Sequence, residues 1–333
     1  MTLAAGDRAA GCLLGLALGD ALGFVVEGAP PSVAAAYVRS ELRAGHAGRQ
    51  GRPPYRAGQY SDDTQLAREL LLSILDAGGF DPGTFGRRIA RLFGEGRAIG
   101  AGPGSRAAAE RLGAGVPWDE AGTPPPYAGN GAAMRAGPLG ALYAADLPRL
   151  VAVARDQALV THRDPRAVAG AVAVAGAVAM AARSGSLVPR ALLAEVGTLV
   201  LPIDRTVADA VAAVEAWLDL SPAEALPCLA TLSAQGERAW NGVSPFVTPG
   251  VAWSLYAFLR SPGDYLETMC TAIEVGGDTD TVAAMAGAMS GAHLGPAALP
   301  GPALARLTDV GDWGASELSE LARQCAVLAL ADG

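Results

Sequence analysis

Glycine recurs at every fourth position near the start of the chain, at Gly11, Gly15, Gly19 and Gly23, within an otherwise apolar segment. Residues four apart lie on one face of an α-helix, so these glycines share one face of a helix that we expect over residues 7–23. A glycine inside a helix costs about 1 kcal/mol relative to alanine. The stripe therefore predicts a helix whose backbone contacts another helix closely.

A second segment of small residues lies near the other end of the chain. The run Gly276-Gly277-Asp278-Thr279-Asp280-Thr281 leads into a segment rich in alanine and glycine, including Ala283 and Gly287. A helix that buries such small residues packs its backbone closely against its neighbours. Its first turn is therefore expected deep in the molecule, where a charged side chain needs a partner.

Composition favours helices over sheets. Hydrophobic residues make up 51% of the 333 residues and aromatic residues only 5%, with alanine prominent and no alternating runs of strand length. We therefore expect an all-α fold of many helices joined by short loops, in a single domain over residues 1–333. The uncharged run 167–182 is short for a membrane span and is interpreted as a central buried helix. The helices are predicted over residues 7–23, 32–43, 62–76, 82–94, 106–111, 129–144, 147–160, 165–182, 188–199, 205–219, 221–234, 249–260, 262–275, 279–294 and 314–331.

Charge and cysteine content indicate the cellular compartment in which the protein acts and the classes of partner that it can bind. Lys and Arg total 25 against 33 Asp and Glu, a formal charge of -8, which disfavours non-specific nucleic-acid binding. The four cysteines are scattered without metal or redox spacing, and no basic segment precedes the first apolar run. We therefore expect a cytoplasmic protein without a membrane partner, and a monomer by default.

A second acidic cluster, Ser61-Asp62-Asp63-Thr64, precedes another apolar helical run. Either cluster by itself could simply cap a helix, because Asp, Ser and Thr are favoured there. Capping needs only one such residue, however, whereas each cluster carries two carboxylates and two hydroxyls. Oxygen ligands of this kind suit Mg²⁺, Mn²⁺ or Ca²⁺, and four carboxylates would balance two divalent cations.

Three other stretches could contribute to a site. The loop containing Gly100, Gly102, Gly104 and Ser105 has the backbone freedom to wrap an anion, or is a flexible connector, and it lacks the P-loop pattern. His162 could contact a substrate or merely end a helix. The sequence has neither a Gly-x-Ser-x-Gly motif nor a suitably placed cysteine, which argues against nucleophilic catalysis.

Five motifs in order resemble those of one family, the ADP-ribosylglycohydrolases. The resemblance covers essentially the whole chain and rests on these residues: Gly15-Leu-Ala-Leu-Gly-Asp20-Ala-Leu-Gly with Glu27, Ser61-Asp62-Asp63-Thr64, Gly129-Asn130-Gly131-Ala-Ala-Met134-Arg135, Thr161-His162 with Asp164-Pro165, and Gly277-Asp278-Thr279-Asp280-Thr281. It implies a compact orthogonal bundle of helices around a binuclear Mg²⁺ or Mn²⁺ centre. Serine stands at position 61, where relatives often have threonine, and it retains the hydroxyl.

The resemblance also implies roles for individual residues. Ser61, Asp62 and Asp63 would bind the metals from one side, and Asp278, Asp280 and Thr281 from the other. The substrate would contact further residues: Gly100, Gly102, Gly104 and Ser105 at the diphosphate, Asn130 and Gly131 at the distal ribose, and His162 in the cleft.

The implied reaction is hydrolysis of the bond between ADP-ribose and an acceptor atom, with ADP-ribose as product. One of Glu27, Asp62 and Asp63 would manage the proton, and the sequence leaves open which of them does so. Two other functions remain open, a two-metal phosphohydrolase and a non-catalytic ADP-ribose-binding or crystallin-like protein on the same scaffold. The acceptor also remains open, because the loops 44–60 and 113–128 that would form the cleft rim carry no readable code.

Overall fold

The computed structural model describes residues 3–183, 185–232 and 240–331, and these residues form helices and loops with no sheet, only isolated β-bridges. The expected all-α class is confirmed. The α-helices in the first part of the chain are α1 (Ala5–Phe24), α2 (Pro31–Tyr37), α3 (Asp62–Ala77), α4 (Pro82–Gly94), α5 (Pro103–Gly113), α6 (Trp118–Ala121), α7 (Gly137–Leu142), α8 (Leu147–Leu159) and α9 (Pro165–Arg183).

The rest of the chain is built in the same way. Its α-helices are α10 (Pro189–Val200), α11 (Arg205–Ala213), α12 (Pro222–Ala225), α13 (Val247–Arg260), α14 (Tyr265–Ile273), α15 (Thr279–Leu294), α16 (Gly301–Leu304) and α17 (Ala315–Ala331). Short helices of other types are the π-helix η1 (Val38–Leu42) and the 3₁₀-helices η2 (Val214–Trp217), η3 (Leu226–Thr231) and η4 (Pro296–Ala298).

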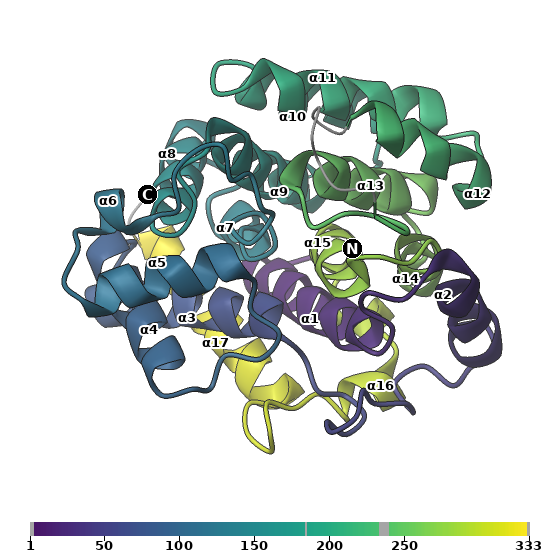
Figure 1. Cartoon of the computed structure of the whole chain (residues 1–333), viewed down its shortest axis with the longest axis horizontal. Coiled ribbons are helices and arrows are strands. Elements are labelled where there is room, and N and C mark those ends of the chain that lie inside the picture. Colours follow the sequence, from purple (N-terminus) through teal and green to yellow (C-terminus); the bar gives the residue numbers. More distant parts are fainter. Residues whose placement is uncertain (1–2, 184, 233–239, 332–333) are drawn as a thin grey trace.

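The two small-residue helices, α1 and α15, pack against each other in the middle of the molecule (Figure 1). A Cβ placed on Gly15 would lie 2.2 Å from the carbonyl oxygen of Gly287, and one placed on Gly287 would lie 2.2 Å from that of Gly15. At the other end of the contact, a Cβ on Gly23 would lie 2.3 Å from the carbonyl oxygen of Thr279. The glycine stripe of α1 therefore meets the backbone of α15 directly, as the stripe predicted, and only glycine fits there.

The apolar helix α9 is also part of the core. It is long and apolar enough to cross a membrane by length and composition, but 89% of its most apolar window is buried inside the protein. Its residues from Ala167 to Ala182 are all buried against neighbouring helices. The prediction of a central buried helix is confirmed.

Several predicted helices differ from the observed ones, two of them at a proline. The helix expected over 205–219 changes from α11 to η2 after Ala213, where there is no proline. The helix expected over 129–144 begins only at Gly137, with Pro138 in its first turn, and residues 131–136 form turns. The helix expected over 221–234 changes from α12 to η3 just before Pro227, which cannot donate the next backbone hydrogen bond. The last two residues of that predicted helix lie outside the described residues.

The contact between α1 and α15 leads to a first testable expectation. Gly15→Ala should lower the free energy of unfolding by at least about 2 kcal/mol, because backbone on both sides cannot yield to the new methyl group. Gly197→Ala in α10 is the matched control. It should leave stability unchanged or raise it by up to about 1 kcal/mol, since nothing lies within 4 Å of its added Cβ. Equal effects of the two changes in urea unfolding would contradict the close contact.

Candidate functional site

A pocket of about 660 Å³ lies between the N-termini of α3, α5 and α15 and the loops that precede α7 and α13. It brings together twelve of the residues selected from the sequence. These are Glu27, Asp62, Asp63, Gly100, Gly102, Ser105, Asn130, Gly131, His162, Asp278, Asp280 and Thr281. The other two, Ser61 and Gly104, lie beside the pocket without lining it. The expected rim loop 113–128 contributes Pro126 and Tyr127 to its wall.

Asp20, from the glycine-bearing helix α1, holds the first turn of α3 in place. Its fully buried carboxylate accepts hydrogen bonds from the backbone N–H of Ser61 (2.9 Å) and of Thr64 (3.0 Å), and from the Thr64 hydroxyl (2.6 Å). The carboxylate thus satisfies N–H groups that a helix N-terminus leaves without partners. Sequence reasoning noted Asp20 only as part of a motif. The only sequence feature that points to this role is the presence of a single acidic residue among the apolar residues of the second half of α1.

Gly276 and Gly277 hold the first turn of α15 in place. Both have positive φ, at 72° and 84°, which a side chain disfavours. A Cβ on Gly276 would lie 2.5 Å from the carbonyl oxygen of Ala29, and one on Gly277 would lie 2.1 Å from that of Val243. The turn is therefore held between two neighbouring segments, and it sets the position of Asp278, the next residue.

The four aspartates that line the pocket are buried, and their hydrogen bonding is incomplete. The side chain of Asp278 makes no capping bond, and it accepts a hydrogen bond from the Asn130 amide at 2.5 Å. Asp63 accepts from the Ser61 hydroxyl at 3.0 Å through one carboxylate oxygen. The other oxygen, Oδ1 of Asp63, and Oδ1 of Asp280 are buried without a hydrogen-bond partner. The Asp278 side chain and these two oxygens are therefore not used to cap their helices.

Burial and mutual repulsion raise the pKa of these acids. Burial raises the pKa of Asp278 to about 6, and Glu27 adds to the increase. The pKa values of Asp62, Asp63 and Asp280 are raised well above the usual range, first by burial and then by neighbouring carboxylates. Ionising all of them together is costly unless positive charge is supplied.

The side chains fit a divalent cation chemically. Carboxylate and hydroxyl oxygens are the ligands that Mg²⁺ and Mn²⁺ prefer, and two buried oxygens are left without a partner. No group of three or more Asp, Glu, His or Cys side chains within the described ranges is already arranged to hold a metal ion. The fit to a cation therefore rests on the type of ligand oxygen and on the two oxygens without a partner. These side chains would have to move closer together to coordinate one ion.

Glu27 lies at the edge of the pocket, in the turn after α1. Its carboxylate forms an ion pair with Arg52, whose guanidinium also lies 4.8 Å from the centre of the Phe24 ring. Arg52 belongs to the expected rim loop 44–60. Both side chains are partly exposed, so Glu27 differs from the four buried aspartates in having contact with solvent.

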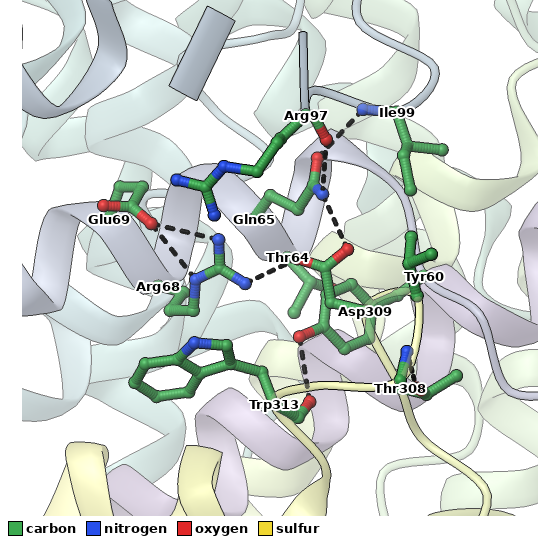
Figure 2. A network of polar contacts seen from close by, with 12 residues as sticks. Tyr60, Thr64, Gln65, Arg68, Glu69, Arg97, Ile99, Thr308, Asp309 and Trp313 are labelled. Atoms are coloured by element: carbon green, nitrogen blue, oxygen red, sulfur yellow. Dashed lines mark hydrogen bonds and ion pairs between the residues drawn. The ribbon is translucent and has the colours of Figure 1, made fainter. Parts of the chain in front are cut away.

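A polar network fixes the glycine loop relative to α3, as Figure 2 shows. The Gln65 side chain accepts from the Ile99 N–H (2.9 Å) and donates to the Arg97 carbonyl (3.0 Å) and to Asp309 (2.8 Å). The Asp62 N–H also donates to the Ile99 carbonyl, at 2.7 Å. Ile99 directly precedes Gly100, so these bonds link the start of the loop to the acidic turn. Sequence reasoning did not identify Gln65.

Hydrogen-bond donors and aromatic rings also line the pocket. Ser105 lies in the first turn of α5, where the preceding Gly104 N–H donates to the Tyr127 hydroxyl at 3.3 Å. Tyr127 and His162 stack with ring centroids 5.8 Å apart. Gly104 contacts this pair, since a Cβ there would lie 2.3 Å from the Tyr127 ring. Trp240 and Phe246 also line the pocket. The sequence offers Trp240 as a weak candidate for stacking on a base and does not single out Phe246.

Comparisons with known proteins agree with this geometry. A family model described as ADP-ribosylglycohydrolase matches residues 1–332. An uncharacterized protein of Archaeoglobus fulgidus is 34% identical over 84% of this chain and 86% of its own length. ADP-ribosylhydrolase ARH3 of Xenopus tropicalis is 28% identical over 90% of each chain. ADP-ribosylarginine hydrolase Tri1 of Serratia proteamaculans is 33% identical over 49% of this chain and 44% of its own.

A solved structure described as an ADP-ribosylglycohydrolase-related protein complex superposes with a TM-score of 0.74 at 30% identity, covering 98% of this chain and 99% of that one. The chain therefore belongs to the ADP-ribosylglycohydrolase family. It is a hydrolase that acts on ADP-ribosyl glycosidic bonds, and the resemblance found in the sequence is confirmed.

The raised pKa of Asp280 leads to a second expectation. The folded protein takes up this proton at a higher pH than the unfolded chain does, so stability falls as pH rises through the folded pKa. With divalent cations chelated, Asp280→Asn should therefore raise the unfolding temperature at pH 8, and the gain should shrink toward pH 4. Asp81→Asn, at an N-cap where hydrogen bonds from Thr84 lower the pKa, is the control and should give no such gain. Loss of stability in Asp280→Asn at pH 8 would contradict the uncompensated charge.

Proposed function

We propose that this protein removes ADP-ribose from an ADP-ribosylated acceptor with the help of two divalent cations, Mg²⁺ or Mn²⁺. The observation that carries the proposal is the mixed lining of one pocket. It combines buried carboxylate oxygens without partners with the N-terminus of a helix, a serine and a histidine. A substrate with a sugar at one end of a diphosphate matches this arrangement.

The residues that would hold the cations come from two helix N-termini. Ser61, Asp62 and Asp63 lie at the start of α3, and Asp278, Asp280 and Thr281 at the start of α15. The Thr281 hydroxyl lies 3.5 Å from Asp63, so the two turns already meet. When bound, the cations would hold the ribose hydroxyls and polarise the sugar. Two such ions would also balance the four buried aspartates.

The rest of ADP-ribose would lie against the glycine loop and α5. The N-terminus of α5, with Gly100, Gly102 and Ser105, suits a diphosphate because the helix dipole favours anions there and the Ser105 hydroxyl can donate a hydrogen bond. Gly104 would act indirectly by letting Tyr127 approach, and its N–H donates to the Tyr127 hydroxyl. Asn130 and Gly131 also line the pocket, and Asn130 already donates to Asp278, so this turn suits the distal ribose.

Glu27 is the carboxylate best placed to move a proton. Asp62 and Asp63 are buried and belong to the cation-binding set, whereas Glu27 is partly exposed at the pocket edge and balanced by Arg52. The reaction breaks the bond between the anomeric carbon and the acceptor atom. Water supplies its hydroxyl to the carbon, and its proton passes to the acceptor by way of Glu27.

The acceptor is expected to be recognised at the pocket rim. Pro126 and Tyr127 of the loop 113–128 line the pocket, whereas the loop 44–60 contacts a lining residue through the ion pair of Arg52 with Glu27. The relatives include a protein described as an ADP-ribosylarginine hydrolase, so an arginine linkage is one candidate beside serine, nucleic-acid ends, small molecules and the polymer. A net charge of -8 disfavours non-specific nucleic-acid binding. We infer that the protein acts in the cytoplasm, since its scattered cysteines fit a reducing compartment. We further propose that it works as a monomer.

The function is tested by release of free ADP-ribose from arginine-, serine-, nucleic-acid- and polymer-linked substrates with Mg²⁺, with Mn²⁺ and with chelator. We expect release from at least one linkage, and chelator should abolish it. Asp62→Asn and Asp280→Asn should lose turnover by about 100-fold or more while remaining folded, since each removes a charged donor of the cation site. Glu27→Gln should lower kcat about 100-fold and still bind ADP-ribose.

The controls separate the parts of this proposal. Normal turnover in Asp280→Asn, or release of ADP-ribose in the presence of chelator, would contradict the proposed cation site. Binding of ADP-ribose without release from any substrate would instead exclude hydrolysis of the linkages tested. Gly197→Ala, in α10 and outside the pocket lining, should match the parent protein in every assay.

A further inference from the structure

Arg135 is a fully buried cation behind the pocket wall. Its guanidinium donates to the Gln157 side chain (2.8 Å) and main chain (2.9 Å), to the Gly131 carbonyl (2.8 Å) and to the Thr161 hydroxyl (2.9 Å). It also lies 5.2 Å from the centre of the Phe85 ring. Because a guanidinium has donors and no acceptor, Thr161 Oγ1 must be the acceptor in their contact.

The Thr161 hydroxyl, whose oxygen already accepts from Arg135, also contacts His162. Thr161 Oγ1 lies 2.8 Å from Nδ1 of His162, a contact that could run in either direction. Among the described residues the hydroxyl proton of Thr161 has no other acceptor. If Nδ1 carried a proton, the oxygen would receive two donors and its own buried proton would be left unpaired, which is costly. The arrangement that satisfies every group has Thr161 donating to an unprotonated Nδ1.

The imidazole is therefore neutral, with its proton on Nε2. Burial, and after it the nearby Arg135 charge, lower the pKa of His162 to about 3, which keeps the doubly protonated form out of the physiological range. Asp164 is the nearby acid that opposes this shift, and it is itself paired with Arg166. A neutral imidazole with an unprotonated Nδ1 has one donor left, the Nε2–H.

Nε2 faces the glycine turn of the pocket. A Cβ placed on Gly129 would lie 3.3 Å from Nε2, and one on Gly131 would lie 2.8 Å from the adjacent ring carbon and 3.0 Å from the Ser105 hydroxyl. The ring edge and Ser105 thus flank the space that the missing side chain of Gly131 leaves open. In the described part of the chain Nε2 has no hydrogen-bond partner, and His162 lines the pocket.

We propose that Arg135 and Thr161 form a relay that fixes His162 as the Nε2–H tautomer, and that this N–H donates to a phosphate oxygen of the bound diphosphate. Arg135 and Thr161 are positioning residues in this relay, and His162 is the group that touches the substrate. The contact between His162 and the phosphate rests on the proposed function. The tautomer of His162 does not depend on it. His162 is then a fixed donor and not a proton acceptor in the reaction.

Nitrogen NMR on the ¹⁵N-labelled protein tests the relay without any substrate. A spectrum of two-bond proton–nitrogen couplings distinguishes a protonated Nε2 from a protonated Nδ1. The chain has only 3 histidines, so His162→Gln identifies the signals. We expect protonated Nε2 and bare Nδ1 at pH 7 in the wild type and in Thr161→Ser, which keeps the hydroxyl. Protonated Nδ1 in the wild type would overturn the relay.

Thr161→Val then links the relay to binding. It removes the donor to Nδ1 while keeping the shape of the side chain, so the Nδ1–H tautomer should become populated. The Kd for ADP-ribose should rise about tenfold, the scale of one hydrogen bond to a charged group, and kcat should change less than KM. Thr161→Ser should restore the tautomer and the affinity, which a purely structural loss would not explain.

The outcomes separate the two claims. Addition of ADP-ribose to the wild type should shift the Nε2–H resonance, and an unshifted resonance in a protein that binds ADP-ribose would overturn the contact with the diphosphate. Unchanged affinity in a folded Thr161→Val protein would do the same. Failure of the wild type to bind ADP-ribose at all would count against the proposed function, whereas the tautomer would still decide whether the relay exists.

Discussion

The backbone contact between α1 and α15 is the constraint on which the rest of the structure depends. Gly23 lies against the first residues of α15, and the Thr279 hydroxyl donates to the Gly23 carbonyl at 2.8 Å. Three residues earlier on α1, Asp20 holds the first turn of α3. One helix therefore positions both acidic turns, by its glycine face on one side and by a single carboxylate on the other.

Bringing these turns together costs free energy. Asp62, Asp63, Asp278 and Asp280 are all buried, and neighbouring aspartates of the group add to the raised pKa of Asp62, Asp63 and Asp280. A protein core excludes such charges unless something compensates for them. Asp20 is compensated by hydrogen bonds, yet the unpartnered oxygens of Asp63 and Asp280 are not. The cost is accounted for if the site exists to hold cations, which links a feature unfavourable for folding to the proposed chemistry.

The sequence predicted the features that depend on local pattern. The glycine spacing indicated the close helix contact, and the two Asp-rich turns were placed correctly at the starts of α3 and α15. Three features depended on tertiary contacts that no local pattern carries: Asp20 acting across helices, Gln65 joining the glycine loop to α3, and Arg52 pairing with Glu27. The late start of α7 is different, because Pro138 in its first turn is a local feature of the sequence. The assignments to metal and substrate stay predictions.

The central claim is that two divalent cations bind between the starts of α3 and α15. The most direct measurement is a crystal structure with Mn²⁺ and ADP-ribose, with anomalous scattering recorded at the manganese absorption edge. The account predicts two strong anomalous peaks between the Asp62–Asp63 and Asp278–Asp280 carboxylates, with the ribose against them. An anomalous map with no peak among these carboxylates, in crystals whose pocket holds ADP-ribose, would contradict it.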